Sequence, residues 1–273
     1  MSNVSGIRTS APPGEPTGWS GVRGKRVLVT GGTRGLGEQI VRLLAAEGAR
    51  VATCARTAGD LEALAESLDV PLFTRALDVT EPEHLEDFVA AMAKRFGGLD
   101  GVVACTGGSR GGRFEEADAG DWAATWELNV GHTARLVRAA VPHLRAAGGG
   151  SVVVISSISG WKPGSPVQYG VAKSAQIQLA ASLARELGPD GIRVNAVSPG
   201  SMLIPGRRWD RMRREDPAAY ADFVATELPS GEPVAPQEVA RVVAFLLSDW
   251  SSGISGAHLP VDRAQNAPSP DGY

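Results

Sequence analysis

Short apolar runs alternate along the chain with longer segments in which apolar residues recur every three or four positions. The short runs are rich in β-branched residues and predict strands buried on both faces, at residues 25–30, 50–55, 72–77, 100–105, 151–155, 191–197 and 254–261. The longer segments predict helices at residues 60–68, 81–96, 167–187 and 236–247, after residue 37, and along a stripe from residue 122 to 144. Such regular alternation predicts an α/β domain.

Length and charge limit the possible functions. The chain has 273 residues, enough for one domain with a substantial core. A net charge of −3 predicts no nucleic-acid partner, and no apolar run approaches the roughly 20 residues that span a bilayer, so no membrane partner is predicted. We interpret residues 1–21 as a disordered leader, residues 22–263 as the domain and residues 264–273 as a polar tail.

The cysteines and histidines give no sign of a metal site. Cys54 and Cys105 lack the spacing of metal ligands, and the four histidines are scattered. Because residues 1–21 contain no apolar segment of a secretory signal, we expect reduced thiols in a cytoplasmic protein.

A glycine loop follows the first predicted strand. Gly31, Gly35 and Gly37 stand between that strand and a helix, with the spacing Gly-x-x-x-Gly-x-Gly. Free backbone N–H groups at a helix start, together with the helix dipole, bind phosphate, and glycine allows close approach. We therefore predict cofactor contacts at Gly31, Thr33, Arg34, Gly35, Leu36 and Gly37.

Two arginines indicate which dinucleotide is bound. NAD sites usually carry an acidic residue after the second strand, where it holds a ribose hydroxyl. This chain has Arg56 there, and Arg34 lies inside the glycine loop. Guanidinium groups suit a 2′-phosphate, so the predicted cofactor is NADP(H).

The stretch after residue 155 carries candidate catalytic chemistry. Tyr169 and Lys173 are four residues apart on a predicted helix and so share one face. An ammonium beside a phenol is expected to lower the phenol's pKa from about 10 and to make it a proton donor or acceptor. Ser156, Ser157 and Ser159 follow the preceding strand, where a hydroxyl can reach a substrate oxygen.

Five motifs in this order resemble the short-chain dehydrogenase/reductase family over about residues 24–263. They are the Thr-Gly-x-x-x-Gly-x-Gly loop, Asp78 after the third strand, Asn129 in a helix, a serine before Tyr169-x-x-x-Lys173, and Pro199-Gly200 after the sixth strand. The resemblance, closest to 3-oxoacyl carrier-protein reductases and other ketoreductases, implies a Rossmann-type doubly wound fold with a parallel seven-stranded sheet. It also implies a homotetramer or homodimer formed through the helices that carry Asn129 and Tyr169.

The resemblance also implies residue roles. Asp78 would contact the adenine, Asn129 would hold a water linked to the lysine, Tyr169 would protonate the substrate, and Lys173 would hold the nicotinamide ribose. Ser157 would polarise the carbonyl, because Ser157-x-x-Gly160 fits the family pattern; Ser156 stays open, and Ser159 is a third choice. Further implied cofactor contacts are Val79, Thr106, Gly107, Tyr169, Lys173, Pro199, Gly200 and Met202.

The chain departs from the family pattern at several points. After strand four, Ala104-Cys105-Thr106-Gly107 replaces the usual Asn-Asn-Ala-Gly, and residues 107–112 are expected to form a flexible loop. Ile204-Pro205 lies where a threonine is frequent, and Arg263 stands where glycine is common.

Residues 201–233 are expected to form an irregular substrate lid. It carries five arginines between residues 207 and 214. Such a run is either a solvated surface neutralised by nearby acids, or a means of steering an anionic substrate group, with Trp209 and Trp161 as walls of an apolar site.

Three functions remain open from the sequence. The first is an NADPH-dependent reductase of a ketone, either a carrier-bound 3-oxoacyl thioester or a polyketide-like ketone. The second is an NAD(P)-dependent alcohol or sugar dehydrogenase working in the oxidative direction. The third is a cofactor-sensing protein without turnover, which an intact Asn, Ser, Tyr and Lys set argues against.

Overall fold

A seven-stranded parallel sheet forms the centre of the molecule in this computed structural model, which describes residues 21–164 and 166–266. The strands follow the order β3-β2-β1-β4-β5-β6-β7 across the sheet. In chain order they are β1 (Arg26–Thr30), β2 (Arg50–Ala55), β3 (Phe73–Ala76), β4 (Gly101–Ala104), β5 (Gly150–Ile155), β6 (Ile192–Pro199) and β7 (His258–Val261). The predicted leader, residues 1–21, lies almost entirely outside the described residues.

Helices connect successive strands. The first half of the chain contributes α1 (Gly35–Ala46), α2 (Ala58–Glu66), α3 (Pro82–Phe96), α4 (Ala119–Trp126), a π-helical turn η1 (Glu127–Gly131) and α5 (His132–Ala146). The second half contributes the short turn η2 (Ile158–Gly160), α6 (Val167–Leu187), η3 (Gly188–Asp190), α7 (Arg208–Glu215), α8 (Pro217–Glu227), α9 (Pro236–Leu247) and η4 (Asp249–Ser251). Among the described residues, none of these helices is both long and apolar enough to cross a membrane.

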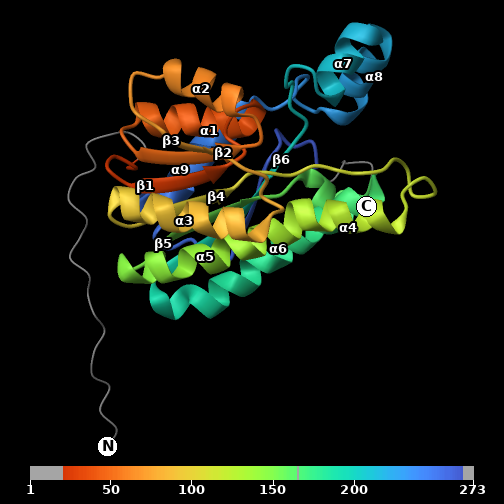
Figure 1. Cartoon of the computed structure of the whole chain (residues 1–273). Coiled ribbons are helices and arrows are strands. Elements are labelled where there is room, and N and C mark those ends of the chain that lie inside the picture. Colours follow the sequence, from red (N-terminus) through yellow and green to blue (C-terminus); the bar gives the residue numbers. More distant parts are fainter. Residues whose placement is uncertain (1–20, 165, 267–273) are drawn as a thin grey trace, which may run out of the picture.

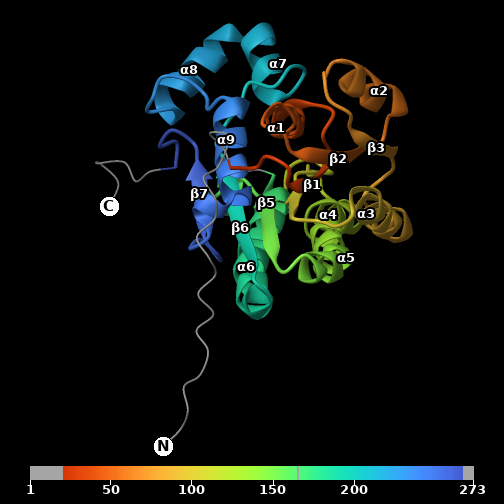
Figure 2. The ribbon, with the colours of Figure 1, turned by 90° about the vertical axis from the view of Figure 1, so that its left-hand side faces the viewer.

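Two apolar cores cover the two faces of the sheet. Side chains of α3, α5 and α6 pack on one face, around Phe88, Leu136 and Ala180. Those of α1, α2 and α9 pack on the other, around Ile40, Leu64 and Val243. Figure 2 shows the sheet between these two layers. The predicted Rossmann-type doubly wound fold is therefore confirmed.

The strand order places the chemistry-bearing loops together. The chain runs outward from β1 through β2 to β3, then returns to β4 on the other side of β1. At the carboxyl edge of the sheet, the loop after β1 and the loop after β4 therefore lead away in opposite directions. Doubly wound folds bind ligands in the crevice between two such loops. Because the strands are parallel, the segments after β5 and β6 reach the same edge.

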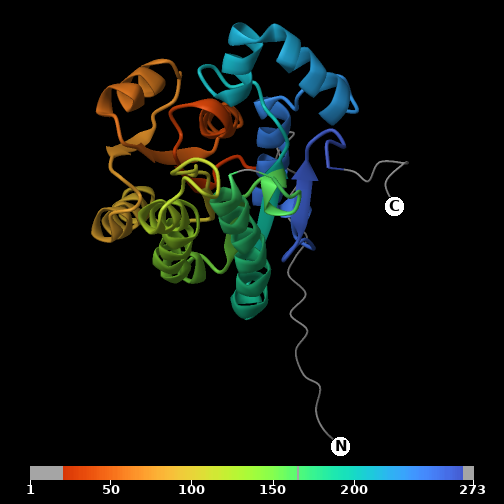
Figure 3. The same cartoon turned by 90° about the vertical axis from the view of Figure 1, so that its right-hand side faces the viewer.

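The lid contains two helices and differs from the irregular segment that we expected. Helices α7 and α8 lie on the same side of the sheet as α1 and α9 (Figures 1 and 3). Trp209 of α7 stacks on Phe223 of α8, with ring centroids 3.8 Å apart. Lys162 donates a 2.5 Å hydrogen bond to Glu227, which ties the end of α8 to the segment after η2.

The start of the predicted polar tail belongs to the domain. Gln265 is buried; its Oε1 accepts a 2.7 Å hydrogen bond from the Ser201 backbone, and its Nε2 donates to Ser201 Oγ at 2.9 Å. Just before it, Arg263 has a left-handed φ of 52°. The position where the family pattern favours glycine is thus held here by an arginine whose guanidinium pairs with Glu238.

The glycine at position 37 is required by close packing of two backbones. A Cβ on Gly37 would lie 2.1 Å from the Gly31 carbonyl oxygen. Backbone atoms cannot move away as a flexible side chain can. The first turn of α1 can therefore press against the end of β1 only because residue 37 has no side chain.

We expect Gly37→Ala to lower the free energy of unfolding by about 1–3 kcal/mol, because overpacking outweighs the gain in helix propensity. Urea unfolding measures the change. Gly59→Ala is the control, because a Cβ on Gly59 of α2 meets no atom within 4 Å. An equal effect of the two substitutions would show that the close contact does not matter.

Candidate active site

The glycine loop forms an open cradle at the start of α1. Gly31 and Gly35 have left-handed φ values of 73° and 57°. Arg34 precedes the helix and, among the described residues, makes no capping hydrogen bond with its side chain. The first N–H groups of α1 therefore receive no side-chain cap from Arg34, and uncapped N–H groups at a helix start suit a phosphate.

The end of β4 lies against this cradle. Thr30 Oγ1 accepts hydrogen bonds from the backbone N–H groups of Cys105 and Thr106, at 3.0 and 3.2 Å. These bonds brace the segment that lacks the family's asparagines. A Cβ on Gly31 would lie 2.8 Å from Thr106 Oγ1, and within the described part of the chain that buried hydroxyl has no partner. An unpaired hydroxyl beside a glycine cradle fits a polar group of a dinucleotide.

Charged side chains surround the far end of the cradle. Burial raises the pKa of Asp78, but hydrogen bonds from Thr80 and the positive charges of Arg56 and Arg110 outweigh burial, so the pKa is lowered. Asp78 is therefore ionised and already holds the Thr80 backbone and hydroxyl, at 2.9 and 2.7 Å.

Arg207, at the base of the lid, joins the two arginines predicted from the sequence. Partial burial and the neighbouring charges of Arg34, Arg211 and Arg56 lower its pKa. Three residues earlier, Ile204 lies close enough to Gly35 that a Cβ there would be 3.1 Å from its Cγ2. The lid thus begins directly over the glycine loop. The arginine run that begins at Arg207 was open to two interpretations, a solvated surface or a means of steering an anionic substrate group. The charges that affect Arg207 are those of Arg34 and Arg56, both predicted cofactor residues, and of Arg211 in α7.

Tyr169 and Ser157 meet at the end of β5. The Ser157 hydroxyl hydrogen-bonds with the Tyr169 side chain and also accepts from the Ser159 backbone N–H at 3.1 Å. Ser156 has a different partner: its buried hydroxyl donates to the Lys173 carbonyl at 2.7 Å. Of the two adjacent serines, therefore, Ser157 is the one whose hydroxyl faces Tyr169.

The electrostatics of Tyr169 differ from our expectation. Burial raises the pKa of Tyr169, and the hydrogen bond with Ser157 only partly opposes this effect. The Lys173 ammonium lies 5.5 Å from the centre of the tyrosine ring and is not among the charges that shift the pKa of Tyr169. The predicted lowering of the phenol pKa by Lys173 is therefore wrong for this arrangement, because burial has the larger effect.

Lys173 is a buried ammonium with two defined acceptors. Nζ donates to the Ile155 carbonyl at 2.9 Å and to Gln176 Oε1 at 2.8 Å. Burial lowers the pKa of Lys173 to about 7. A Cβ on Gly107 would lie 2.9 Å from Nζ, so the loop after β4 closes over the ammonium where it lacks a side chain.

Asn129 sits in the π-helical turn between α4 and α5. Its buried Nδ2 donates to the Gly108 and Thr125 carbonyls, both at 2.7 Å, and its Oδ1 accepts from the Gly108 N–H at 3.2 Å. Its carbonyl accepts from Thr133 Oγ1 at 2.6 Å and from Gln176 Nε2 at 2.9 Å. The extra residue of a π-turn, a frequent feature of functional sites, points this side chain at the loop after β4.

The loop of residues 107–112 is hydrogen-bonded at several points, unlike the flexible loop that we expected. Besides the bonds from Asn129, the Arg110 N–H donates to Thr125 Oγ1 at 2.9 Å. Gln168 of α6 donates to the carbonyls of Arg110 and Gly112, at 2.7 and 3.2 Å. Gln168 and Gln176 were not predicted from the sequence. Each is a polar residue on the buried face of α6, one position before Tyr169 and three positions after Lys173, and that pattern could have indicated them.

The remaining predicted cofactor residues lie near the same edge. Leu36 and Val79 are buried, Thr33 is half-buried, and Met202 packs against the core that contains α1. Pro199 ends β6, and a Cβ on Gly200 would lie 2.8 Å from Asp262. Gly200 thus marks a close approach between the end of β6 and the segment after β7.

The two tryptophans predicted to form substrate walls have other partners. Trp161 is half-exposed and contacts His258 edge to face, with centroids 5.1 Å apart. Trp209 is stacked on Phe223 within the lid. The role of these two tryptophans as walls of a substrate site stays a prediction.

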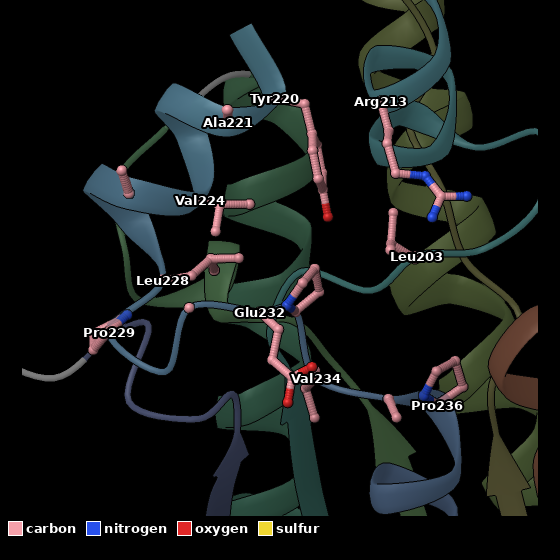
Figure 4. A pocket seen from close by; sticks show the side chains of 14 residues that line it. Leu203, Arg213, Tyr220, Ala221, Val224, Leu228, Pro229, Glu232, Val234 and Pro236 are labelled. Atoms are coloured by element: carbon pink, nitrogen blue, oxygen red, sulfur yellow. The ribbon is translucent and has the colours of Figure 1, made fainter. Parts of the chain in front are cut away.

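A separate cavity of about 830 Å³ lies under the lid. Figure 4 shows Tyr220 of α8 extending into it opposite Leu203, with Glu232 below. Its lining residues belong to the lid and the segment leading into α9, and Asn129, Ser157, Tyr169 and Lys173 are not among those described as lining it. It is therefore distinct from the catalytic candidates.

Comparisons with known proteins agree with this geometry. A family model described as enoyl-(acyl carrier protein) reductase matches residues 31–263. The chain is 34% identical over 251 residues to isoepoxydon dehydrogenase patN of Penicillium expansum, covering 89% of this chain and 95% of that protein.

Solved structures extend the likeness to the whole fold. The structure of L-sorbose reductase from Gluconobacter frateurii, complexed with NADPH and L-sorbose, superposes with a TM-score of 0.84 at 30% identity, covering 92% of this chain and 99% of that one. A short-chain type dehydrogenase/reductase from Mycobacterium ulcerans has a TM-score of 0.83 at 31% identity, over 89% and 90% of the two chains. With its glycine cradle and its Ser157, Tyr169 and Lys173 cluster, the chain belongs to the short-chain dehydrogenase/reductase family of oxidoreductases.

Proposed function

We propose that this protein is an NADPH-dependent oxidoreductase that reduces a ketone to a secondary alcohol. The observation that carries the proposal is the meeting of Ser157, Tyr169 and Lys173 at the carboxyl edge of the sheet, beside the glycine cradle of α1. The family uses a nicotinamide cofactor, which when bound would supply the hydride.

Each side chain has a task in this proposal. Tyr169 gives its phenolic proton to the carbonyl oxygen, and the Ser157 hydroxyl hydrogen-bonds the same oxygen. Lys173 uses an N–H group to hold a ribose hydroxyl. Asn129 keeps the loop after β4 in place through its bonds to Gly108.

The protonation state of Tyr169 supports the reductive direction. A phenol whose pKa is raised by burial stays protonated at neutral pH, and a protonated tyrosine is the form that donates to a carbonyl. Oxidation of an alcohol would need the phenolate instead. The oxidative alternative is the second candidate, since one relative is named as a dehydrogenase and another as a reductase.

The choice of NADPH rests on charge. Arg34 and Arg56 are exposed at the cradle, and Arg207 lies near both. Three guanidinium groups near one another repel each other, and a dianionic 2′-phosphate would relieve that repulsion. Ionised Asp78 is engaged by Thr80 and lies beside Arg56 and Arg110, within reach of the adenosine half in the proposal.

The substrate class and the assembly remain part of the proposal. We propose a small-molecule ketone, carrier-bound as a 3-oxoacyl thioester or polyketide-like, in a cytoplasmic homodimer or homotetramer. The exposed Val167 and Val171 on α6 and Trp126 on α4 are apolar side chains available for contacts between subunits.

NADPH consumption with acetoacetyl thioesters, cyclic ketones and ketoses tests the substrate class. A lack of turnover with every ketone, despite NADPH binding, would favour a sensing role.

We expect Tyr169→Phe to lower kcat by at least about 10²–10⁴-fold, because the proton donor is lost while the ring remains. NADPH binding, followed by fluorescence, should stay within a few-fold of the unmodified protein. Tyr220→Phe, in the lid, is the matched control and should keep its activity. A Tyr169→Phe protein with more than half of the original kcat would remove Tyr169 from the mechanism.

We expect the unmodified protein to bind NADPH more tightly than NADH, and Arg56→Asp to weaken NADPH binding by about 10- to 150-fold, because a charge-assisted contact is lost. NADH binding should change much less. Titrations with both cofactors measure the effect, and Arg95→Asp, on the exposed side of α3, controls for the change of net charge. Equal affinity of the unmodified protein for the two cofactors would contradict the assignment to NADP(H).

A further inference from the structure

One buried amide joins the three helical segments around the candidate site. Gln176 is fully buried on α6. Its Oε1 accepts from Lys173 Nζ at 2.8 Å, and its Nε2 donates to the Asn129 carbonyl at 2.9 Å and to Thr133 Oγ1 at 3.1 Å. The side chain therefore links the ammonium on α6 directly to the π-helical turn and to α5.

The partners fix which way this amide points. Lys173 can only donate, so the atom that faces it must be the amide oxygen, and the Asn129 carbonyl can only accept, so the amide nitrogen must face that group. A flipped amide would place two donors together at Lys173 and two acceptors together at Asn129. The orientation of Gln176 thus follows from the chemistry of its neighbours.

The bridge leaves little freedom to the groups that it joins. A carbonyl oxygen has two lone pairs, and that of Asn129 already accepts from Thr133 and Gln176. The ammonium has three N–H groups, of which two point at Ile155 and Gln176. Among the described residues no third acceptor is seen, so one N–H group of Lys173 is left for a ligand, and its direction is set by the other two.

We propose that Gln176 is a positioning residue for the reaction, which holds the Lys173 ammonium between Ile155 and Asn129 by a direct amide bridge. The inference rests on the proposed function, in which Lys173 holds the cofactor ribose. A water molecule at this place could reorient, whereas a side-chain amide anchored to the helix cannot. The amide therefore fixes the direction of the Lys173 ammonium and supplies an acceptor that favours its charged form.

The other titratable groups around Lys173 are neutral near pH 7. Burial raises the pKa of the Cys105 thiol to about 12, and burial together with the charge of Lys173 lowers the pKa of His132 to about 3. The raised pKa of Tyr169 keeps its phenol protonated. Of these groups only Lys173, with a pKa of about 7, changes its charge between pH 6 and 9.

Two substitutions of nearly the same shape test the bridge in opposite directions. Gln176→Met removes the acceptor that favours the charged lysine, so the pKa of Lys173 should fall. Gln176→Glu places a carboxylate there, so that pKa should rise. If the reaction needs the ammonium, the pH at which kcat declines on the alkaline side should move down by about one unit or more in Gln176→Met, and up by a similar amount in Gln176→Glu.

The control is Gln178→Met, on the exposed side of the same helix, which should leave the pH profile in place. Circular dichroism verifies that each variant is folded, and the glutamate variant alone still decides the direction if the methionine variant does not fold. If Gln176 had only a structural role, both variants would be less stable, and the pH at which kcat declines would not move in opposite directions. Unchanged profiles, or shifts of both variants in one direction, would overturn the inference.

The test separates this inference from the proposed function. If the unmodified protein reduces no ketone but binds NADPH, the proposed activity is wrong. The pH dependence of NADPH affinity then replaces kcat, with the same opposite shifts expected, because Lys173 would still contact the cofactor. Opposite shifts in affinity would support the bridge without turnover, and equal pH profiles of affinity would reject it.

Discussion

Burial of one ammonium group is the constraint around which this site is built. Lys173 has little contact with solvent, and a buried charge is costly unless its donors are satisfied. The end of β5, the turn η1 and the side chain of Gln176 supply or orient its acceptors. The parallel sheet makes this possible, because it brings the end of β5 next to the loop after β4, where Gly107 admits the ammonium. The fold therefore determines the chemistry of the site through the place where it buries Lys173.

Much of the architecture could be predicted from the sequence, because strong periodicity marks buried elements. The predicted bounds of β2, α6 and α9 agree with the structure, and Ala-, Leu- and Val-rich stretches leave few alternatives there. The first lid helix was missed for the opposite reason. Helix α7 is almost entirely charged and buries none of its residues, so it has no apolar stripe to detect.

The chemistry was only partly predictable. The spacing of Tyr169 and Lys173 correctly placed them on one face of a helix, but spacing does not reveal how far burial raises the pKa of a phenol. The turn η1 depends on contacts between Asn129 and a loop 21 residues earlier, which no local pattern encodes. Gln176 shows the same limit, because its importance comes from partners on two other helical segments.

The internal stacking of the lid has an evolutionary consequence. Trp209 and Phe223 pack on each other, so α7 and α8 share a small apolar contact of their own. The end of α8 is joined to the segment after η2 by the hydrogen bond from Lys162 to Glu227. Selection can therefore alter the lid surface without disturbing the buried ammonium or its acceptors. One framework can in this way acquire new specificities during divergence, while the candidate catalytic residues stay unchanged.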